Sequence, residues 1–159
     1  MNPQMVMYEE EFNQITVVCD RLTKEANAKV VFLVDKNGQL VASCGQTDNL
    51  DTTSLASLTA GNIAATGGLA KLIAEKEFAT QFLQGEKDNL FICTVASRVI
   101  LVVIFDAKTS LGLVQLRVKK ASSELTKIFE ELLKKVEAPG AGSPFAEITD
   151  DDIDNLFSE

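Results

Sequence analysis

The sequence contains no histidine and no tryptophan, and it has only one tyrosine among its 159 residues. Without histidine it can form neither a Ser-His-Asp triad nor a Cys-His pair, and it cannot build a metal site from imidazole ligands. It has no run of 18 apolar residues, so we expect no transmembrane helix. Its N-terminus carries no basic segment followed by an apolar core, and we therefore expect no secretory signal.

Motifs that bind cofactors or metals are missing as well. There is no Gly-x-x-x-x-Gly-Lys-Ser/Thr segment for a P-loop, and Gly61 and the Gly67-Gly68 pair do not have the spacing of a dinucleotide fingerprint. A calcium loop that starts at Asp150 fails, because Asn155 stands where the loop needs glycine and the chain ends before the twelfth position. We therefore expect neither a cofactor nor a metal.

Cysteine is also scarce. The three copies, Cys19, Cys44 and Cys93, lie far apart and form no C-x-x-C motif. An odd number of separate cysteines fits a reducing cytoplasm better than a disulfide framework or a zinc site. We interpret all three as small hydrophobic residues of the core.

Most of the net charge of −8 lies near the C-terminus. Residues 143–159 contain six acidic side chains and no basic one, which leaves a balance of −2 for the rest of the chain. The negative charge argues against nucleic acid and anionic membrane as partners. A terminal block of one sign is typical of a solvated tail or an interaction segment. With 46% hydrophobic and 24% charged residues, the chain has the composition of one globular domain.

Periodicity predicts the elements of this domain. Apolar residues at helical spacing predict a helix over 8–26, and a β-branched run predicts a strand over 30–34. Asn37-Gly38 is the preferred pair for a type I′ turn, so we expect a return strand over 40–42.

The second half continues with a helix over about 53–77, capped by Asp51 or Thr52, and a weaker edge strand over 78–86. Strands over 90–95 and 99–105 form a second hairpin; the latter has no polar residue and should be central. A last helix is expected over about 110–135, before a segment rich in proline and glycine.

The predicted order is therefore α-β-β-α-β-β-β-α, an α+β (α/β) fold. Tight hairpins require antiparallel pairing, so the five strands should form one antiparallel sheet covered by three helices, two on one face and one on the other. The domain organisation is a folded domain over 1–136, a linker over 137–144, and an acidic tail with a short amphipathic helix over 145–159.

This order, together with three segments, resembles the Roadblock family, the relatives of the dynein light chains. The segments are VVFLVDKNG at 30–38, LASLTAGN at 55–62 and LFICTVAS at 90–97. The stretches TSLGLVQLRVKK at 109–120 and SPFAEITDDDIDNLF at 143–157 are similar to the gliding-motility proteins of that family. The likeness covers the chain from about Met5 to Glu159.

The resemblance implies a homodimer, in which the second helices and third strands pair across a two-fold axis. It also implies a partner, a Ras-like small GTPase of the MglA type, on which two subunits act as a GTPase-activating protein. Such a protein controls cell polarity and motility from the cell poles, in the cytoplasm. The alternative is a scaffold without effect on GTP hydrolysis, as other Roadblock proteins serve in motor or signalling complexes; such a minimal scaffold subunit would lack the tail.

The small-residue helix is the first candidate for partner binding. Its interior glycines each disfavour a helix by about 1 kcal/mol relative to alanine, which suggests that another backbone approaches closely. One interpretation is packing on the sheet or on a dimer mate alone, and the other adds docking of the GTPase. The candidate residues follow steps of about four along one line: Ala56, Ala60, Ala64, Gly67, Gly68 and Lys71.

The tail is the second candidate. Thr149 can cap a short helix, and acidic residues fill its first turn, where they suit the helix dipole. Such a helix is too short to persist alone, which favours folding on a partner over a purely solubilising role. The candidate contacts in the tail are its large apolar residues, Phe145, Ile148, Ile153, Leu156 and Phe157.

Only Arg98, in the second hairpin turn, is placed like a catalytic arginine finger, because Arg21 and Arg117 fall on helices. We interpret Arg98 as a solvated turn residue. The resemblance agrees, because activators of this kind use no finger and instead bring the catalytic groups of the GTPase into position. No residue of this chain is therefore expected to be catalytic.

Overall fold

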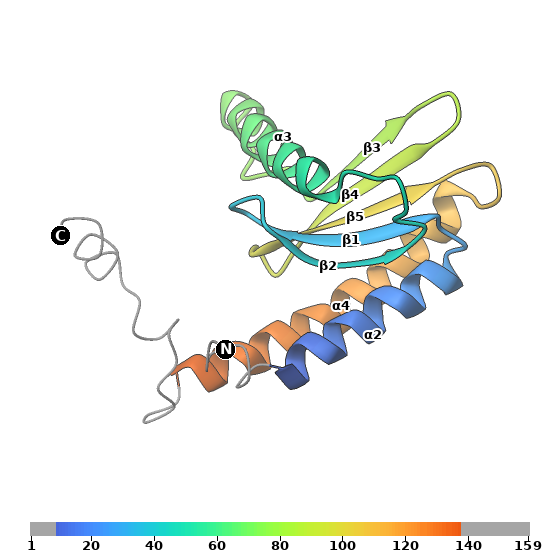
Figure 1. Ribbon diagram of the computed structural model, residues 1–159. Helices are drawn as coiled ribbons and strands as arrows, with labels where there is room; N and C mark the ends of the chain where they lie inside the picture. Colours follow the sequence, from blue (N-terminus) through green and yellow to red (C-terminus); the bar gives the residue numbers. More distant parts are fainter. Residues whose placement is uncertain (1–8, 138–159) are drawn as a thin grey trace.

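The computed structural model describes residues 9–137, and the predicted tail contacts from Phe145 to Phe157 lie outside this part of the chain. Eight elements follow one another in the predicted order (Figure 1). They are α2 (Glu9–Glu25), β1 (Val30–Asp35), β2 (Leu40–Gly45), α3 (Thr52–Leu72), β3 (Thr80–Gln84), β4 (Asn89–Val95), β5 (Val99–Phe105) and α4 (Leu111–Glu137).

The five strands form one antiparallel sheet in the order β2-β1-β5-β4-β3. Every residue of β5 is buried, as its uniformly apolar sequence predicted. β3 lies at one edge, also as predicted, and β2 lies at the other. Each edge strand has a single neighbour within the described chain.

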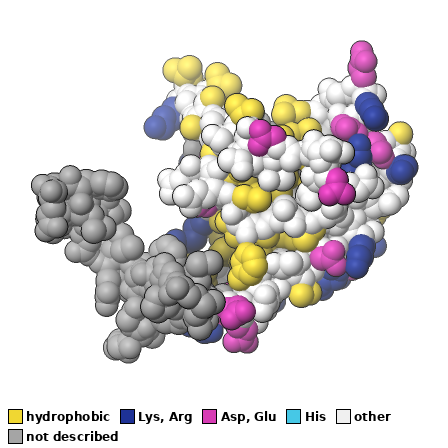
Figure 2. All heavy atoms as spheres, in the orientation of Figure 1, with side chains coloured by type: hydrophobic (Ala, Val, Ile, Leu, Met, Phe, Trp, Pro, Cys, Tyr) yellow, Lys and Arg dark blue, Asp and Glu magenta, His cyan; other side chains and the backbone are white. Residues whose placement is uncertain are grey.

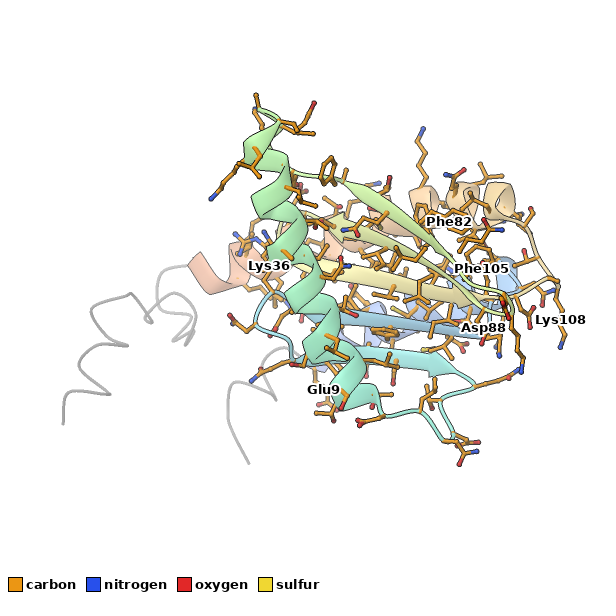
Figure 3. The ribbon with its side chains drawn as sticks, turned by 90° about the horizontal axis from the view of Figure 1, so that it is seen from above. Glu9, Lys36, Phe82, Asp88, Phe105 and Lys108 are labelled. Atoms are coloured by element: carbon orange, nitrogen blue, oxygen red, sulfur yellow. The ribbon has the colours of Figure 1, made fainter. Side chains whose placement is uncertain are left out.

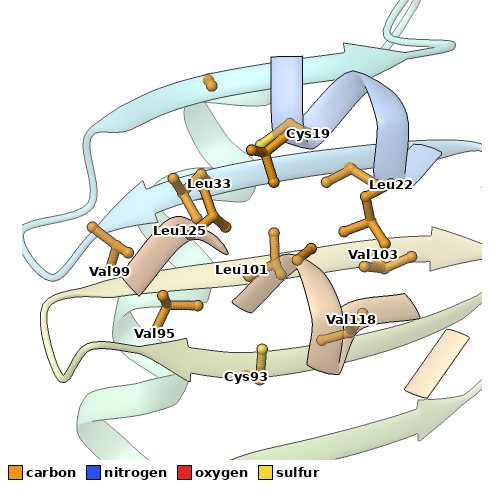
Figure 4. Packing of buried hydrophobic residues seen from close by; sticks show 14 of the residues in the cluster. Cys19, Leu22, Leu33, Cys93, Val95, Val99, Leu101, Val103, Val118 and Leu125 are labelled. Carbon is orange, nitrogen blue, oxygen red and sulfur yellow. The ribbon is translucent and has the colours of Figure 1, made fainter. Parts of the chain in front are cut away.

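The helices cover the sheet as predicted, with α2 and α4 on one face and α3 on the other (Figure 1). Side chains of a strand alternate between the two faces. Leu33, Leu101 and Val103 therefore contribute to the larger cluster beneath α2 and α4, seen in Figure 4, whereas Phe32 and Val102 face α3.

Helices α2 and α4 run side by side and are joined by ion pairs. Arg21 donates two hydrogen bonds to the carboxylate of Glu124, at 2.9 and 3.3 Å. At the other end of the pair, Lys135 contacts Glu11, a carboxylate that is almost fully buried. None of the helices in the described residues has the length and apolar character needed to cross a membrane.

Two details differ from the sequence prediction. α3 ends at Leu72 rather than near residue 77, because Ala74 adopts a positive φ of 60°. The amide of Glu75 then donates a hydrogen bond to the carbonyl of Ala70 at 2.8 Å, and the amide of Ala74 donates one to the carbonyl of Lys71 at 3.3 Å. These two bonds form a Schellman motif, which closes the helix before the predicted end.

The first hairpin also turns differently. Of the pair Asn37-Gly38, only Gly38 has a positive φ, so the connection is not the predicted type I′ turn, which needs positive φ at both central residues. The carboxylate of Asp35 instead accepts hydrogen bonds from the amides of Asn37 and Gln39, both at 2.9 Å. The paired positive φ values occur in the second hairpin, at Ala96 and Ser97.

Candidate functional site

Helix α3 has no separate polar face, unlike α2 and α4: apolar residues are spread around it, and Lys71 is its one charged residue. Its buried residues are Ala56, Thr59 and Ala70, and Ala56 belongs to the apolar cluster between α3 and the sheet. Large apolar side chains are nevertheless exposed along and just after the helix: Leu58 at 72%, Leu69 at 57%, Leu72 at 83% and Ile73 at 63%. Figure 2 shows such hydrophobic groups gathered over the free end of α3. Large apolar side chains that are exposed together are typical of a surface that contacts another molecule.

The predicted line of small residues does not stay on one face of the molecule. Steps of four residues advance by about 400°, so the line drifts by about 40° at each step. Ala56 lies in the core with 1% exposure and Ala60 is half-buried, whereas Ala64 and Gly68 are exposed. The structure therefore separates Ala56, a packing residue, from the accessible end of the line.

The interior glycines of α3 face open space. A β carbon added at Gly61, Gly67 or Gly68 would meet no atom of the chain within 4 Å, apart from the backbone of the helix itself and adjacent residues. Packing within this chain therefore does not require them. Each of these glycines weakens the helix, and no packing contact among the described residues accounts for that cost.

Beside the C-terminal half of α3 lies a hollow of about 390 Å³, which we call the α3 hollow. Its apolar lining comes from α3, from the segment that follows α3 and from the sheet. Its lining residues include Ala60, Ile63, Ala64, Gly67, Gly68 and Phe78, with Thr94 and Ile100 from the sheet. Five of the predicted site residues, Ala60, Ala64, Gly67, Gly68 and Lys71, are thus brought together at one place.

The hollow is ringed by positive charge. Lys36 reaches it from the β1–β2 turn, Lys71 from the last turn of α3, and Lys76 from the segment after the helix, while Glu77 is its one acidic lining residue. Figure 3 shows Lys36 beside α3, at the opposite end of the sheet from Asp88 and Lys108. Lys71 was predicted as a site residue, whereas Lys36 and Lys76 were missed, because no local pattern in the sequence brings the β1–β2 turn and the segment after α3 to the same place.

The edge strand β3 exposes apolar side chains on both faces of the sheet: Leu83 lies opposite Leu90 on the α3 face, whereas Phe82 lies opposite Phe91 on the face covered by α2 and α4. Phe82 and Leu83 are 40% and 44% exposed, and the ring of Phe82 stacks on that of Phe105 with centroids 6.0 Å apart. An open edge strand next to an apolar helix is a combination that a second chain can cover by adding strands and packing side chains.

The surroundings of the cysteine and arginine side chains do not indicate reactive groups. Cys19 and Cys93 are buried, as predicted, and burial raises the pKa of each thiol to about 12, while Cys44 is only half-buried. Arg21 is paired with Glu124, and Arg98 is exposed in its turn. Among the described residues no cluster of metal-ligating side chains occurs.

The chain has clear relatives among known proteins. Residues 14–105 match the Roadblock/LC7 domain. Among solved structures, the chain is similar to Myxococcus xanthus MglB, with 74% sequence identity over 79% of this chain and 94% of that one, and a TM-score of 0.76. It is similar to the gliding protein MglB from Thermus thermophilus, with 33% identity over 76% and 92% of the two chains and a TM-score of 0.72.

A third solved structure, described as MglB with a tetrameric arrangement, is 31% identical over 76% of this chain and 91% of that one, with a TM-score of 0.72. The search of the curated proteins gives no match. The domain match spans more than half of the chain, and the similarity to MglB covers nearly the whole of the matched proteins. The chain therefore belongs to the Roadblock/LC7 family, within its MglB group.

Proposed function

We propose that this protein is a GTPase-activating protein for a Ras-like small GTPase of the MglA type, and that it acts as a homodimer. The observation that carries the proposal is the outward face of α3. It is apolar, it exposes Leu58, Leu69 and Leu72, and its glycines Gly61 and Gly68 have open space in front of them. The resemblance to gliding-motility proteins supplies the identity of the partner.

The homodimer part of the proposal rests on two adjoining features. Among the described residues, one edge of β3 has no neighbouring strand, and Phe82 and Leu83 of this strand are exposed. α3 exposes large apolar side chains that its own sheet does not cover. Pairing of both elements with those of a second copy would remove this surface from water. A self-association of MglB is also named in the relative with a tetrameric arrangement.

In the proposed mechanism the chain supplies binding energy and no catalytic group. A surface that binds one conformation of the GTPase switch regions more tightly than others increases the population of that conformation. The arginine and glutamine that stabilise the transition state then come from the GTPase itself. The acidic tail, residues 145–159, is proposed as a second contact that aids nucleotide exchange.

The cellular setting follows from the same resemblance. We propose that the protein works in the cytoplasm, enriched at a cell pole, where it controls polarity and motility. No nucleic acid, membrane insertion, metal or cofactor is part of the proposal.

The experiment is GTP turnover by the cognate GTPase with and without this protein. A multiple-turnover rate that rises with added protein supports activation. An unchanged rate at protein concentrations where the two proteins form a complex would favour the alternative, a Roadblock scaffold that recruits a GTPase or a motor complex without changing hydrolysis. Exchange of a labelled nucleotide, measured with the full chain and with a chain ending at residue 142, tests the role of the tail.

A further inference from the structure

A groove on the face of the sheet opposite α3 lies between α4 and the strands β3 and β4. It has a volume of about 430 Å³, and we call it the α4–β3 groove. Its floor is formed by Phe91 and Cys93 of β4 and Val118 of α4, buried members of the apolar cluster beneath α2 and α4 (Figure 4). Exposed side chains of α4, among them Lys119 and Ser123, form its rim.

Strand β3 leaves one side of this groove uncovered. Thr80 lies opposite Cys93, and Phe82 lies opposite Phe91, so both side chains are on the face of the sheet that α2 and α4 cover. Both are nevertheless exposed. When strands pair, their hydrogen bonds form at the edge of the sheet and leave its faces free. Pairing of β3 in the proposed homodimer therefore does not close the groove, whereas pairing of α3 would cover the α3 hollow.

The charge of the groove suits an acidic segment. Among the described residues that line it, Lys119 is the one charged side chain. The tail over 143–159 carries six acidic residues and no basic one. Opposite charges of this kind attract over about 10 Å at moderate ionic strength and raise the rate of encounter.

The apolar residues of the tail suit the floor of the groove. Ile153, Leu156 and Phe157 follow the spacing i, i+3, i+4, by which an amphipathic segment places its anchors in a groove. A groove of about 430 Å³ has the size of a small ligand site, which accommodates a few side chains rather than a whole helix. The acidic run lies directly before these anchors, so both kinds of contact can form together.

The fold brings the start of the tail to this side of the sheet. α4 forms one wall of the groove and leads directly into the tail. Ser123 on the rim and Glu137 are 14 residues apart in α4, a helical length of about 21 Å. The 11 residues over 138–148 can span about 36 Å when extended, and they contain Pro139 and Gly140, which suit a reversal of the chain along α4.

A groove between α2 and α4 lies nearer to the end of α4 but suits the tail less. Its acidic residues Glu10 and Glu124 offset its basic residues Arg21 and Lys127. Arg21 is moreover already paired with Glu124 at 2.9 Å. An acidic segment therefore gains no net attraction in that groove.

We infer that the α4–β3 groove is occupied by the protein's own tail, with Leu156 and Phe157 on its apolar floor and the acidic run beside Lys119. The interaction is intramolecular, so it needs only weak intrinsic affinity. A segment held at an effective concentration of about 1 mM and binding with a Kd of about 0.1 mM occupies its site in about 90% of molecules.

This contact would also control when the tail is available. On the proposed function, which this consequence rests on, the tail makes a second contact with the GTPase, so it must first leave the groove. The groove and the α3 surface lie on opposite faces of the sheet, so a stored tail leaves the proposed docking surface on α3 free. The presence of the tail in the groove does not itself depend on any GTPase.

The absence of tryptophan provides a clean reporter for this inference. In the full-length Phe157→Trp chain, without GTPase, a tail in the groove shields the indole from acrylamide and shifts its emission to shorter wavelength. The reference for an exposed indole is a peptide of residues 143–159 with the same substitution. Lys119→Glu should release the tail. If the tail then binds ten times more weakly, occupancy falls from about 90% to about half, a roughly fivefold rise in the exposed fraction.

The matched control is Lys120→Glu in the same Phe157→Trp chain. Lys120 is exposed and is the next residue of α4, but it lies on the side toward Arg21 and Glu25 of α2, and the change in net charge is identical. Shielding that survives in the control and is lost with Lys119→Glu supports the inference. An indole as accessible in the parent as in the peptide, or shielding that both variants affect equally, overturns it. Because no GTPase is present, neither result depends on the proposed activity.

Discussion

The backbone of Gly38 packs directly against Ser57: a β carbon added at Gly38 would lie 3.3 Å from the Cα of Ser57 and 3.6 Å from the Cβ of Ala60. The β1–β2 turn is thereby held under α3, and Lys36 is carried to the rim of the α3 hollow. Gly38 also has a φ of +91°, a conformation that other residues adopt only with strain. This glycine is therefore required by the fold of the single chain.

Gly38, which packs against α3, and Gly61, which faces open space, should respond in opposite ways to substitution by alanine. Gly38→Ala should lower the free energy of unfolding by about 1–2 kcal/mol, because it combines an unfavourable φ with a close backbone contact. Gly61→Ala should raise it by about 0.5–1 kcal/mol in the monomer, because alanine favours the helix and meets no other atom of the chain. Urea unfolding at several protein concentrations measures the free energy of unfolding of both variants and of the parent. A monomer destabilised by Gly61→Ala would show that this face is already packed.

A bulky charge at the accessible end of the small-residue line should block docking without unfolding the protein. Ala64→Arg and Gly68→Arg place a long side chain on an exposed face, and we expect each to reduce stimulation of GTP hydrolysis by about 100-fold, the effect of losing a central contact. Ala107→Arg, at an exposed position in the β5–α4 loop, is the control and should leave stimulation unchanged. Normal stimulation by the Ala64→Arg and Gly68→Arg variants, with circular dichroism showing folded protein, would remove α3 from the docking surface.

Arg98 tests whether the protein donates a catalytic arginine. Its side chain is exposed in the β4–β5 turn, while its amide closes the turn by bonding to the carbonyl of Val95 at 3.0 Å. An arginine finger supplied in trans is worth about 10³–10⁵ in rate. We expect Arg98→Ala to leave the maximal stimulated rate within about twofold of the parent, because in the proposed mechanism the GTPase supplies its own arginine. A loss of three orders of magnitude in single-turnover hydrolysis at saturating protein would assign the finger to Arg98.

The N-terminal cap of α3 should make its stability depend on pH in the acid range. The carboxylate of Asp51 accepts hydrogen bonds from Ser54 Oγ at 2.6 Å and from the Ser54 amide at 3.0 Å, and these bonds lower the pKa of Asp51 below its usual value. A lowered pKa in the folded state means that the contribution is fully present above the unfolded pKa of about 3.9, and that it is lost as the pH falls through the folded value.

The measurement compares the parent with Asp51→Ala by urea unfolding between neutral pH and about pH 2.5, a range that reaches well below the unfolded pKa of about 3.9. The stability advantage of the parent should be constant near neutral pH and should shrink in the acid range. Asp51→Asn keeps a capping oxygen but cannot titrate, so its advantage over Asp51→Ala should change little. A parent advantage that persists undiminished at the lowest pH would contradict the role of the charged carboxylate.

Local patterns were strong enough to predict most of the fold. The uniformly apolar run from Val99 to Phe105 predicted a central strand, and it is buried along its whole length between β1 and β4. The carboxylate of Asp51 was one of two caps predicted for α3 and is the one observed. Element boundaries were less accurate, because Ala74 rather than a glycine takes the left-handed position that ends α3, and alanine gives no sequence signal for it.

The candidate site was predicted only in part. Small residues at steps of four indicated α3, but the sequence did not show that the line turns from the core at Ala56 to the surface at Gly68. That distinction depends on the angle at which α3 crosses the sheet. The contribution of Lys36 to the hollow likewise depends on the contact of Gly38 with Ser57, two residues on elements that no local pattern links.

The sequence by itself determined the type and order of the elements, the acidic tail, and the absence of histidine chemistry, because periodicity, turn residues and composition act over a few neighbouring positions. Only the tertiary structure decided which glycines face open space and where three lysines from separate segments meet. These properties arise from packing between residues distant in sequence, and such packing is set by the whole fold rather than by any segment of it.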